Sequence, residues 1–209
     1  MNNTSHPVSH NNSKTTLASP KGVSDNNSQE STNLPLAIAL PQTIQENLRY
    51  HLSMSVLMTP DMANFTGNVH GGDLLKMLDQ VAYACASRYS GSYVVTLSVD
   101  QVIFREPIHV GELVTFLASI NYVGKTSMEV GIRVEAENIQ ARTIRHTNSC
   151  YFTMVAIDEN RKPVAVPPLN LETDEQVRRY HAGKIRKEQR LALIQQTQAN
   201  PKNSPKCCL

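Results

Sequence analysis

The 209-residue sequence predicts an α+β fold in which an antiparallel sheet wraps around a single long helix. Two observations lead to this prediction. Residues 72–88 are apolar around well over half of a helix circumference. Four long runs rich in β-branched residues then follow, at 93–104, 113–123, 127–138 and 143–157. No helical pattern separates these runs, which argues for neighbouring antiparallel strands and against βαβ units.

A further strand is expected before the helix, at residues 50–59, where apolar side chains alternate loosely along one face. Pro60 ends this strand because proline has no backbone N–H to donate. Residues 41–48 are expected to form a short helix or turn. The sheet therefore has about five to six strands.

Alternation is clearest in the run at 127–138, where apolar side chains take one face and charged side chains the other. The apolar set is Met128, Val130, Ile132, Val134 and Ala136, and the charged set is Glu129, Arg133, Glu135 and Glu137. One face of the sheet is therefore expected to be wet. A curled sheet of this kind around one apolar helix is the hot-dog architecture.

The regions outside this core differ in composition. Residues 171–196 are basic, and within them Thr173, a good N-cap, is followed by two acids, so a solvated C-terminal helix is expected. Residues 1–47 are rich in Asn and Ser and are expected to form a disordered or loosely ordered extension. A flexible tail is expected at 197–209, which leaves 48–170 as one domain.

Composition excludes several classes of function. Twenty Lys and Arg face eighteen acids, so no nucleic-acid partner is expected. The chain has no signal-peptide pattern and no apolar run of about 20 residues, which predicts a cytoplasmic protein without membrane insertion. The four cysteines lack CxxC spacing and a nearby His cluster, so no metal site is expected.

One carboxylate interrupts the apolar helix. At 3.6 residues per turn, Asp79 shares a stripe with Leu75, Ala82 and Ala86, and is therefore predicted to point away from water. A buried acid must be neutralised, hydrogen-bonded or used in function. Two interpretations stay open: Asp79 is a general base or nucleophile, or it makes a structural hydrogen bond to a neighbouring loop.

Other polar groups gather near the start of this helix. The N–H groups of Gly71 and Gly72 are expected to be unpaired at its positive end, where they suit an oxyanion, although a tight turn with close packing explains the glycines equally well. Asn64 offers an amide to orient a thioester or water, or simply favours a turn. His70 is either a general base of a dehydratase or a helix-entry residue packed against the sheet.

On these residues the chain resembles the hot-dog acyl-CoA thioesterases, the group that includes bacterial short acyl-CoA hydrolases and the mammalian brain acyl-CoA hydrolase. The resemblance covers about residues 48–195 and rests on several ordered motifs. They are Asn64-x-x-Gly67-x-x-x-Gly71-Gly72 followed by Asp79, Val99-Asp100-x-x-x-Phe104-x-x-Pro107-Ile108, Gly124-Lys-Thr-Ser127-Met128-Glu-Val, Phe152-Thr-x-Val-Ala-Ile-Asp158, and Val166-Pro-x-Leu followed by Glu172-Thr.

The resemblance implies hydrolysis of acyl-CoA to a free carboxylic acid and coenzyme A, without any cofactor other than the coenzyme A of the substrate. It implies that Asn64 and Asp79 are the catalytic pair and meet across a dimer interface, in a homo-oligomer built as a trimer of dimers. It also implies that the C-terminal basic helix lies near coenzyme A. Substrate contacts are expected from His70, Gly124, Lys125, Thr126 and Ser127.

Two other functions stay open on the same fold. One is a non-catalytic acyl-CoA-binding protein, and the other is a hydratase or dehydratase that uses His70. A carboxylate beside an acyl chain brings no advantage to a pure binder, so the presence of both Asn64 and Asp79 favours the hydrolase.

Overall fold

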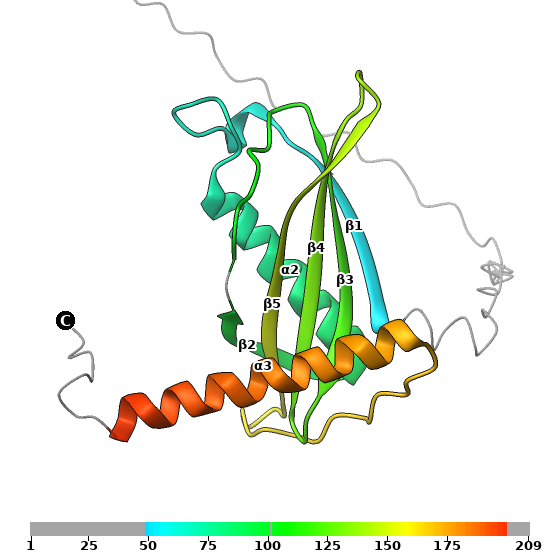
Figure 1. Cartoon of the computed structure of the whole chain (residues 1–209), viewed down its shortest axis with the longest axis vertical. Coiled ribbons are helices and arrows are strands. Elements are labelled where there is room, and N and C mark those ends of the chain that lie inside the picture. The colour runs from blue at the N-terminus through cyan, green and yellow to red at the C-terminus, as the bar shows by residue number, and fades with distance from the viewer. Residues whose placement is uncertain (1–48, 101, 200–209) are drawn as a thin grey trace, which may run out of the picture. The chain divides into compact units, whose positions relative to one another are not determined.

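The computed structural model describes residues 49–100 and 102–199. They form a five-stranded antiparallel sheet of order β1-β3-β4-β5-β2, with the long helix α2 against one face and α3 across the other (Figure 1). The elements are β1 (His51–Leu57), η1 (Pro60–Met62), α2 (Gly71–Ser90), β2 (Tyr93–Asp100), β3 (Leu113–Val123), β4 (Ser127–Asn138), β5 (Thr143–Ile157) and α3 (Asp174–Ala199). This arrangement confirms the predicted α+β hot-dog fold.

The strand predictions are accurate where alternation is strong. Three strands, β3, β4 and β5, have the predicted bounds, and β1 lies inside its predicted range. The second strand is shorter than predicted, because it ends at Asp100 and not at Phe104. Beyond Asp100 the chain leaves the ladder, and a bond from the Arg105 N–H to the Thr147 carbonyl (3.1 Å) returns it to β5. The extension predicted at 1–47 and the turn predicted at 41–48 lie outside the described residues.

Helix α2 supplies one side of the core. It ends at Gly91, whose φ of 68° is the left-handed conformation that a helix C-cap requires and that glycine adopts at least cost. Its buried residues pack against the inner faces of all five strands. They are Leu74, Met77, Leu78, Val81, Ala82, Cys85, Ala86 and Tyr89. Burial of a side chain of the size of Leu or Val contributes about 1.5–3 kcal/mol.

Helix α3 covers part of the sheet face that was expected to be wet. Glu129 on β4 is only 4% exposed, because Arg186 of α3 lies over it and donates two hydrogen bonds to its carboxylate. The two surfaces lie close together at Gly183, where a Cβ atom would lie 2.8 Å from the Cβ of Tyr122. The expectation of a wet face is therefore wrong at this end of β4, whereas Arg133 further along the strand is exposed.

The start of α3 is capped as predicted. The Gln176 N–H donates to the Thr173 hydroxyl (3.2 Å), and the Gln176 side chain accepts from the Thr173 N–H (3.0 Å). This reciprocal pair is a capping box. Gly183 is the sole buried residue of α3, so the helix is largely solvated along its length. The division of the chain at residues 47, 170 and 196 stays a prediction.

Candidate functional site

Asp79 lies on the flank of α2, and its side chain is exposed in the single chain. The prediction that it points away from water is therefore wrong for the single chain. The sheet of one chain covers the side of the helix that carries Leu78 and Val81, and each successive residue turns away by about 100°. Leu75 and Tyr83, one turn before and after Asp79, are likewise 40% and 39% exposed. Asp79 thus stands in an uncovered apolar strip.

The partner of the Asp79 carboxylate in the single chain is Thr96 on β2. The Thr96 hydroxyl donates to Oδ1 of Asp79 at 2.6 Å and lies 3.6 Å from the sulfur of Met154. A β-bulge follows directly: Thr96 pairs with Met154 and Ser98 with Thr153, so Leu97 is left without an opposite residue. Bulges commonly re-aim side chains next to active sites. Sequence reasoning missed Thr96, although a hydroxyl in a mostly apolar run was a visible signal.

Of the two roles proposed for Asn64, the structure shows the turn, and the role toward a thioester or water stays a prediction. Its amide oxygen accepts from the Thr66 N–H (2.9 Å), the Thr66 hydroxyl (2.7 Å) and the Asn68 N–H (3.2 Å), which fixes the turn before α2. Three donors on one atom also assign the orientation of the amide. Its NH₂ group points away from them and donates to none of the described residues. In the single chain no hydrogen bond joins Asn64 to Asp79.

The two glycines at the start of α2 differ. The Gly72 N–H donates to Nδ1 of His70 at 2.9 Å, so the expectation that this N–H is unpaired is wrong. A Cβ on residue 72 would lie 2.9 Å from the same nitrogen, which explains the glycine. The Gly71 N–H donates to none of the described residues. His70 is the N-cap of the helix and is exposed, so it does not pack against the sheet.

The predicted substrate segment forms the turn between β3 and β4, at the end of the sheet opposite to the start of α2 (Figure 1). The Gly124 N–H donates to the Ser127 carbonyl (2.7 Å), while the carbonyls of Lys125 and Thr126 accept from Val166 and Ala156. A Cβ on Gly124 would lie 2.7 Å from the Lys187 ammonium nitrogen. The structure therefore brings this turn together with the basic helix α3.

A cavity of about 490 Å³ opens beside this turn. Gly124 and Lys125 line it together with apolar residues of the segment that leads to α3, and with the ring of Tyr180. A cationic rim next to an apolar wall suits a ligand that carries both phosphate and a flat ring.

The described cysteines are not nucleophiles. Cys85 and Cys150 are both buried, and burial raises the pKa of each thiol to about 12. A thiol with so high a pKa is almost entirely protonated near neutral pH and does not attack a thioester. The described residues contain no cluster of three or more His, Cys, Asp or Glu that would hold a metal ion. None of the helices described is both long and apolar enough to cross a membrane.

The surface around Asp79 and Thr96 is apolar and belongs to an edge strand. β2 pairs with β5 on one side, and no described strand pairs with its other side. Large side chains along it are exposed, among them Tyr93, Val95, Leu97 and Val99. Tyr83 of α2 stacks edge-on against Tyr93 at 5.8 Å and extends the same surface. A long, exposed apolar edge strand is a surface on which another chain can pair.

Sequence comparisons with known proteins identify the family of this chain. Residues 66–142 match the thioesterase superfamily. Protein VdlD of Helicobacter pylori is 55% identical over 148 residues, which span 71% of this chain and 84% of the relative. An uncharacterized acyl-CoA thioester hydrolase of Zymomonas mobilis is 38% identical over 124 residues, which span 56% of this chain and 79% of the relative.

Solved structures of acyl-CoA hydrolases and thioesterases are also similar to this chain. The acyl-CoA hydrolase of Staphylococcus aureus, solved with butyryl coenzyme A and coenzyme A, is 28% identical with a TM-score of 0.66 over 71% of this chain and 91% of that chain. A hexameric acyl-CoA thioesterase is 33% identical with a TM-score of 0.68 over 70% and 94% of the two chains. The chain belongs to the thioesterase superfamily. Within it, the chain is a member of the hot-dog acyl-CoA thioester hydrolases, a family of enzymes.

Proposed function

We propose that this protein hydrolyses acyl-CoA to a free carboxylic acid and coenzyme A, and that Asp79 activates the attacking water. The observation that carries the proposal is the presentation of Asp79: its carboxylate is held by the Thr96 hydroxyl at 2.6 Å and faces an uncovered apolar strip. An acyl chain would lie against this strip, with its thioester next to the Asp79 carboxylate.

The role of each catalytic group follows from the hydrogen bonds that it can still make to a substrate. A water molecule attacks the thioester carbonyl carbon and gives its proton to Asp79. The oxyanion that forms accepts from the Gly71 N–H and from the Asn64 NH₂ group, neither of which has a partner among the described residues. The oxyanion then collapses to the carboxylic acid as the C–S bond breaks, and the departing sulfur takes the proton back from Asp79 and leaves as the thiol of coenzyme A. Direct attack by Asp79, through a transient anhydride, is the alternative route.

We infer that the site is completed by a second copy of the chain. The edge of β2 and its exposed apolar side chains are suited to pairing with the same edge of another copy, which would cover Leu75, Asp79 and Tyr83. Asn64 of that copy would then face Asp79. Hexameric relatives support a trimer of such dimers.

The spacing of three residues supports their assignment. The S. aureus hydrolase has been solved as separate alanine variants of an asparagine, an aspartate and a threonine. In that protein the asparagine and aspartate are 15 positions apart and the aspartate and threonine 17, as are Asn64, Asp79 and Thr96 here. The same chemistry would explain why these three types of side chain recur at this spacing.

For coenzyme A we propose the turn at Gly124, Lys125, Thr126 and Ser127. The Lys187 ammonium lies over this turn, and the adjoining cavity has an apolar wall. His70 caps α2 and is proposed to contact the substrate only through its exposed edge. A cytoplasmic location fits the relatives named cytosolic acyl coenzyme A thioester hydrolases in rat and human.

One assay tests the proposal and separates it from its rivals. The protein is mixed with short, medium and long acyl-CoA and with enoyl-CoA, and thiol release is followed beside the enoyl absorbance. We expect thiol release from acyl-CoA. Saturable binding without thiol release would instead identify a binding protein, and loss of enoyl absorbance without thiol release would identify a hydratase.

A further inference from the structure

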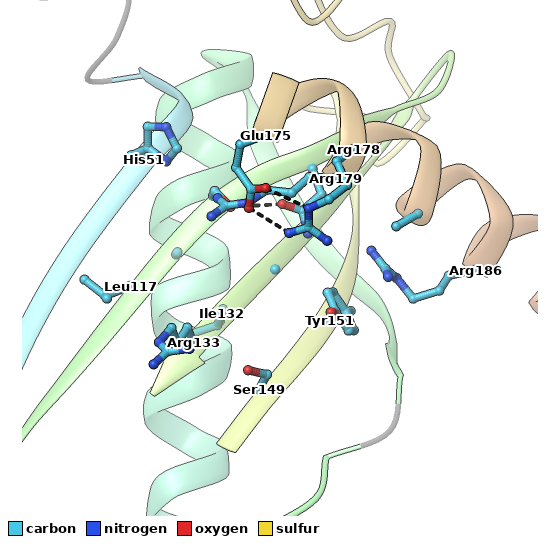
Figure 2. A pocket seen from close by; sticks show the side chains of 15 residues that line it. His51, Leu117, Ile132, Arg133, Ser149, Tyr151, Glu175, Arg178, Arg179 and Arg186 are labelled. Atoms are coloured by element: carbon cyan, nitrogen blue, oxygen red, sulfur yellow. Dashed lines mark hydrogen bonds and ion pairs between the residues drawn. The ribbon is translucent and has the colours of Figure 1, made fainter. Parts of the chain in front are cut away.

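A second polar groove lies on the outer face of the sheet, beneath the first half of α3, and the proposed reaction does not use it. Its volume is about 440 Å³, within the range typical of small-molecule sites. Figure 2 shows Glu175 between Arg178 and Arg179 of α3, with Ser149 and Tyr151 on the strand below. Four arginines line this arginine groove: Arg133, Arg178, Arg179 and Arg186.

Two of these arginines are already paired with acids. Arg186 donates to the buried Glu129 and lies with its guanidinium carbon 3.6 Å above the Tyr151 ring. Arg133 pairs with Glu135 at 2.7 Å on β4. Each of these cations therefore has an acid of its own, and neither leaves charge over for a ligand.

The other two arginines share a single carboxylate. Arg178 donates to both oxygens of Glu175 at 2.7 Å, and Arg179 donates to one of them at 2.8 Å. A second nitrogen of Arg179 donates to Ser119 at 3.0 Å on the groove floor. Two guanidinium groups facing one acid leave one positive charge uncompensated at the mouth of the groove.

Glu175 itself marks the place as favourable for an anion. Its hydrogen bonds from Arg178 and then from Arg179 lower the pKa of its carboxyl to about 2. A phosphate group has more acceptor oxygens than a carboxylate and matches the two-pronged guanidinium donors in the same geometry. Glu175 is half exposed, so it is free to swing out and release both arginines.

We propose that the arginine groove binds a phosphate-bearing small molecule, whose phosphate takes the place of the Glu175 carboxylate between Arg178 and Arg179. The site is separate from that of the reaction. Side chains alternate between the faces of a strand, and the groove is floored by outward residues such as Ser119 and Ser149, whereas Asp79 belongs to α2 on the inner face.

The test is calorimetric titration of the full chain with inorganic pyrophosphate. We expect saturable binding that weakens with added salt, because the attraction is between charges at the surface. Arg178→Gln should weaken this binding about tenfold, since one charge-assisted pair is lost. Lys184→Gln is the matched control: it removes one cation from the exposed side of the same helix, outside the groove, and should leave the affinity unchanged.

A variant of opposite sign makes the test sharper. Glu175→Gln removes the internal competitor but keeps the side-chain length, so it should tighten pyrophosphate binding several-fold, by about 3- to 10-fold. Absence of pyrophosphate binding, equal losses in Arg178→Gln and Lys184→Gln, or weaker binding in Glu175→Gln would each overturn the proposal.

Coenzyme A carries phosphate too, so a competition arm distinguishes a separate ligand from the substrate of the proposed function. Saturating coenzyme A should leave pyrophosphate bound with unchanged affinity, and competition between the two would overturn the claim of a separate site. This readout is binding, so it stands whether or not the chain releases thiol. Failure of the groove and failure of the hydrolase are therefore distinguishable.

Discussion

The surface around Asp79 and the arginine groove are both open in the single chain, but they are built in opposite ways. At Asp79 one carboxylate is held by one hydroxyl, and its surroundings are exposed apolar side chains. In the groove the charges are many, and Arg178 and Arg179 share the one carboxylate of Glu175 near a buried clamp between Arg186 and Glu129. The first surface resembles half of an interface, whereas the second is complete within one chain.

This difference indicates what each region needs. Apolar side chains exposed along an edge strand gain free energy when another surface covers them, by roughly 25 cal/mol per Å². Paired arginines in water gain little from being covered, because each would lose its hydration. We therefore expect the Asp79 surface to depend on assembly and the arginine groove to be largely independent of it.

The largest effect is expected from Asp79→Asn. The variant keeps the shape and the acceptor for Thr96 but cannot take a proton from water, so kcat should fall by about 10²- to 10⁴-fold. Asp73→Asn, on the same helix, is the control and should retain activity. Size-exclusion chromatography should show the same oligomer for both variants. An unchanged kcat for Asp79→Asn would discard the mechanism.

The next largest effect is on stability at the outer face. Arg186→Met leaves the buried Glu129 carboxylate without its main partner and should lower the free energy of unfolding by about 3 kcal/mol. Arg178→Met breaks an exposed pair of similar length and should cost far less, because water screens the two charges. Urea unfolding monitored by circular dichroism measures both. Equal losses would show that α3 is not clamped at Arg186.

Asn64 offers a test that separates its two hydrogen-bonding roles. Asn64→Asp keeps an acceptor for Thr66 and Asn68 but removes the NH₂ donor, whereas Asn64→Ala removes both. If the donor stabilises the oxyanion, both variants should lose about 10²-fold in kcat. Only the alanine variant should also loosen the turn. A rise in KM alone would make Asn64 a positioning residue.

The smallest effect is expected at Thr96. Thr96→Val removes the hydrogen bond that orients the Asp79 carboxylate and should lower kcat about tenfold. Thr96→Ser keeps the hydroxyl and should retain most of the activity. A valine variant as active as the wild type would show that the bond is incidental to the reaction.

The sequence predicted the strands well, because alternation is a local property. The run from Ser127 to Asn138 alternates strictly, and its predicted and observed bounds coincide. Local signals also placed the start of α2 at the glycine pair. In each of these cases the residues that decide the structure are neighbours in the chain.

The site was harder to predict, because its geometry depends on distant parts of the chain. Helical period gives the angle of Asp79 around α2, but it does not give how much of the circumference the sheet covers. Thr96 reaches Asp79 through a bulge whose position depends on pairing with β5. The cover of Glu129 by α3 joins residues 57 positions apart. Such contacts leave no periodic trace in one sequence.

The most direct test of the central claim, that one site takes Asp79 from one chain and Asn64 from another, is complementation. Asp79→Ala and Asn64→Ala chains are produced separately, mixed after unfolding, refolded together and assayed for thiol release. Random pairing should restore about a quarter of the wild-type sites, because half of the dimers are mixed and each mixed dimer has one intact site. Activity no higher than that of the two inactive parents would contradict a site shared between chains.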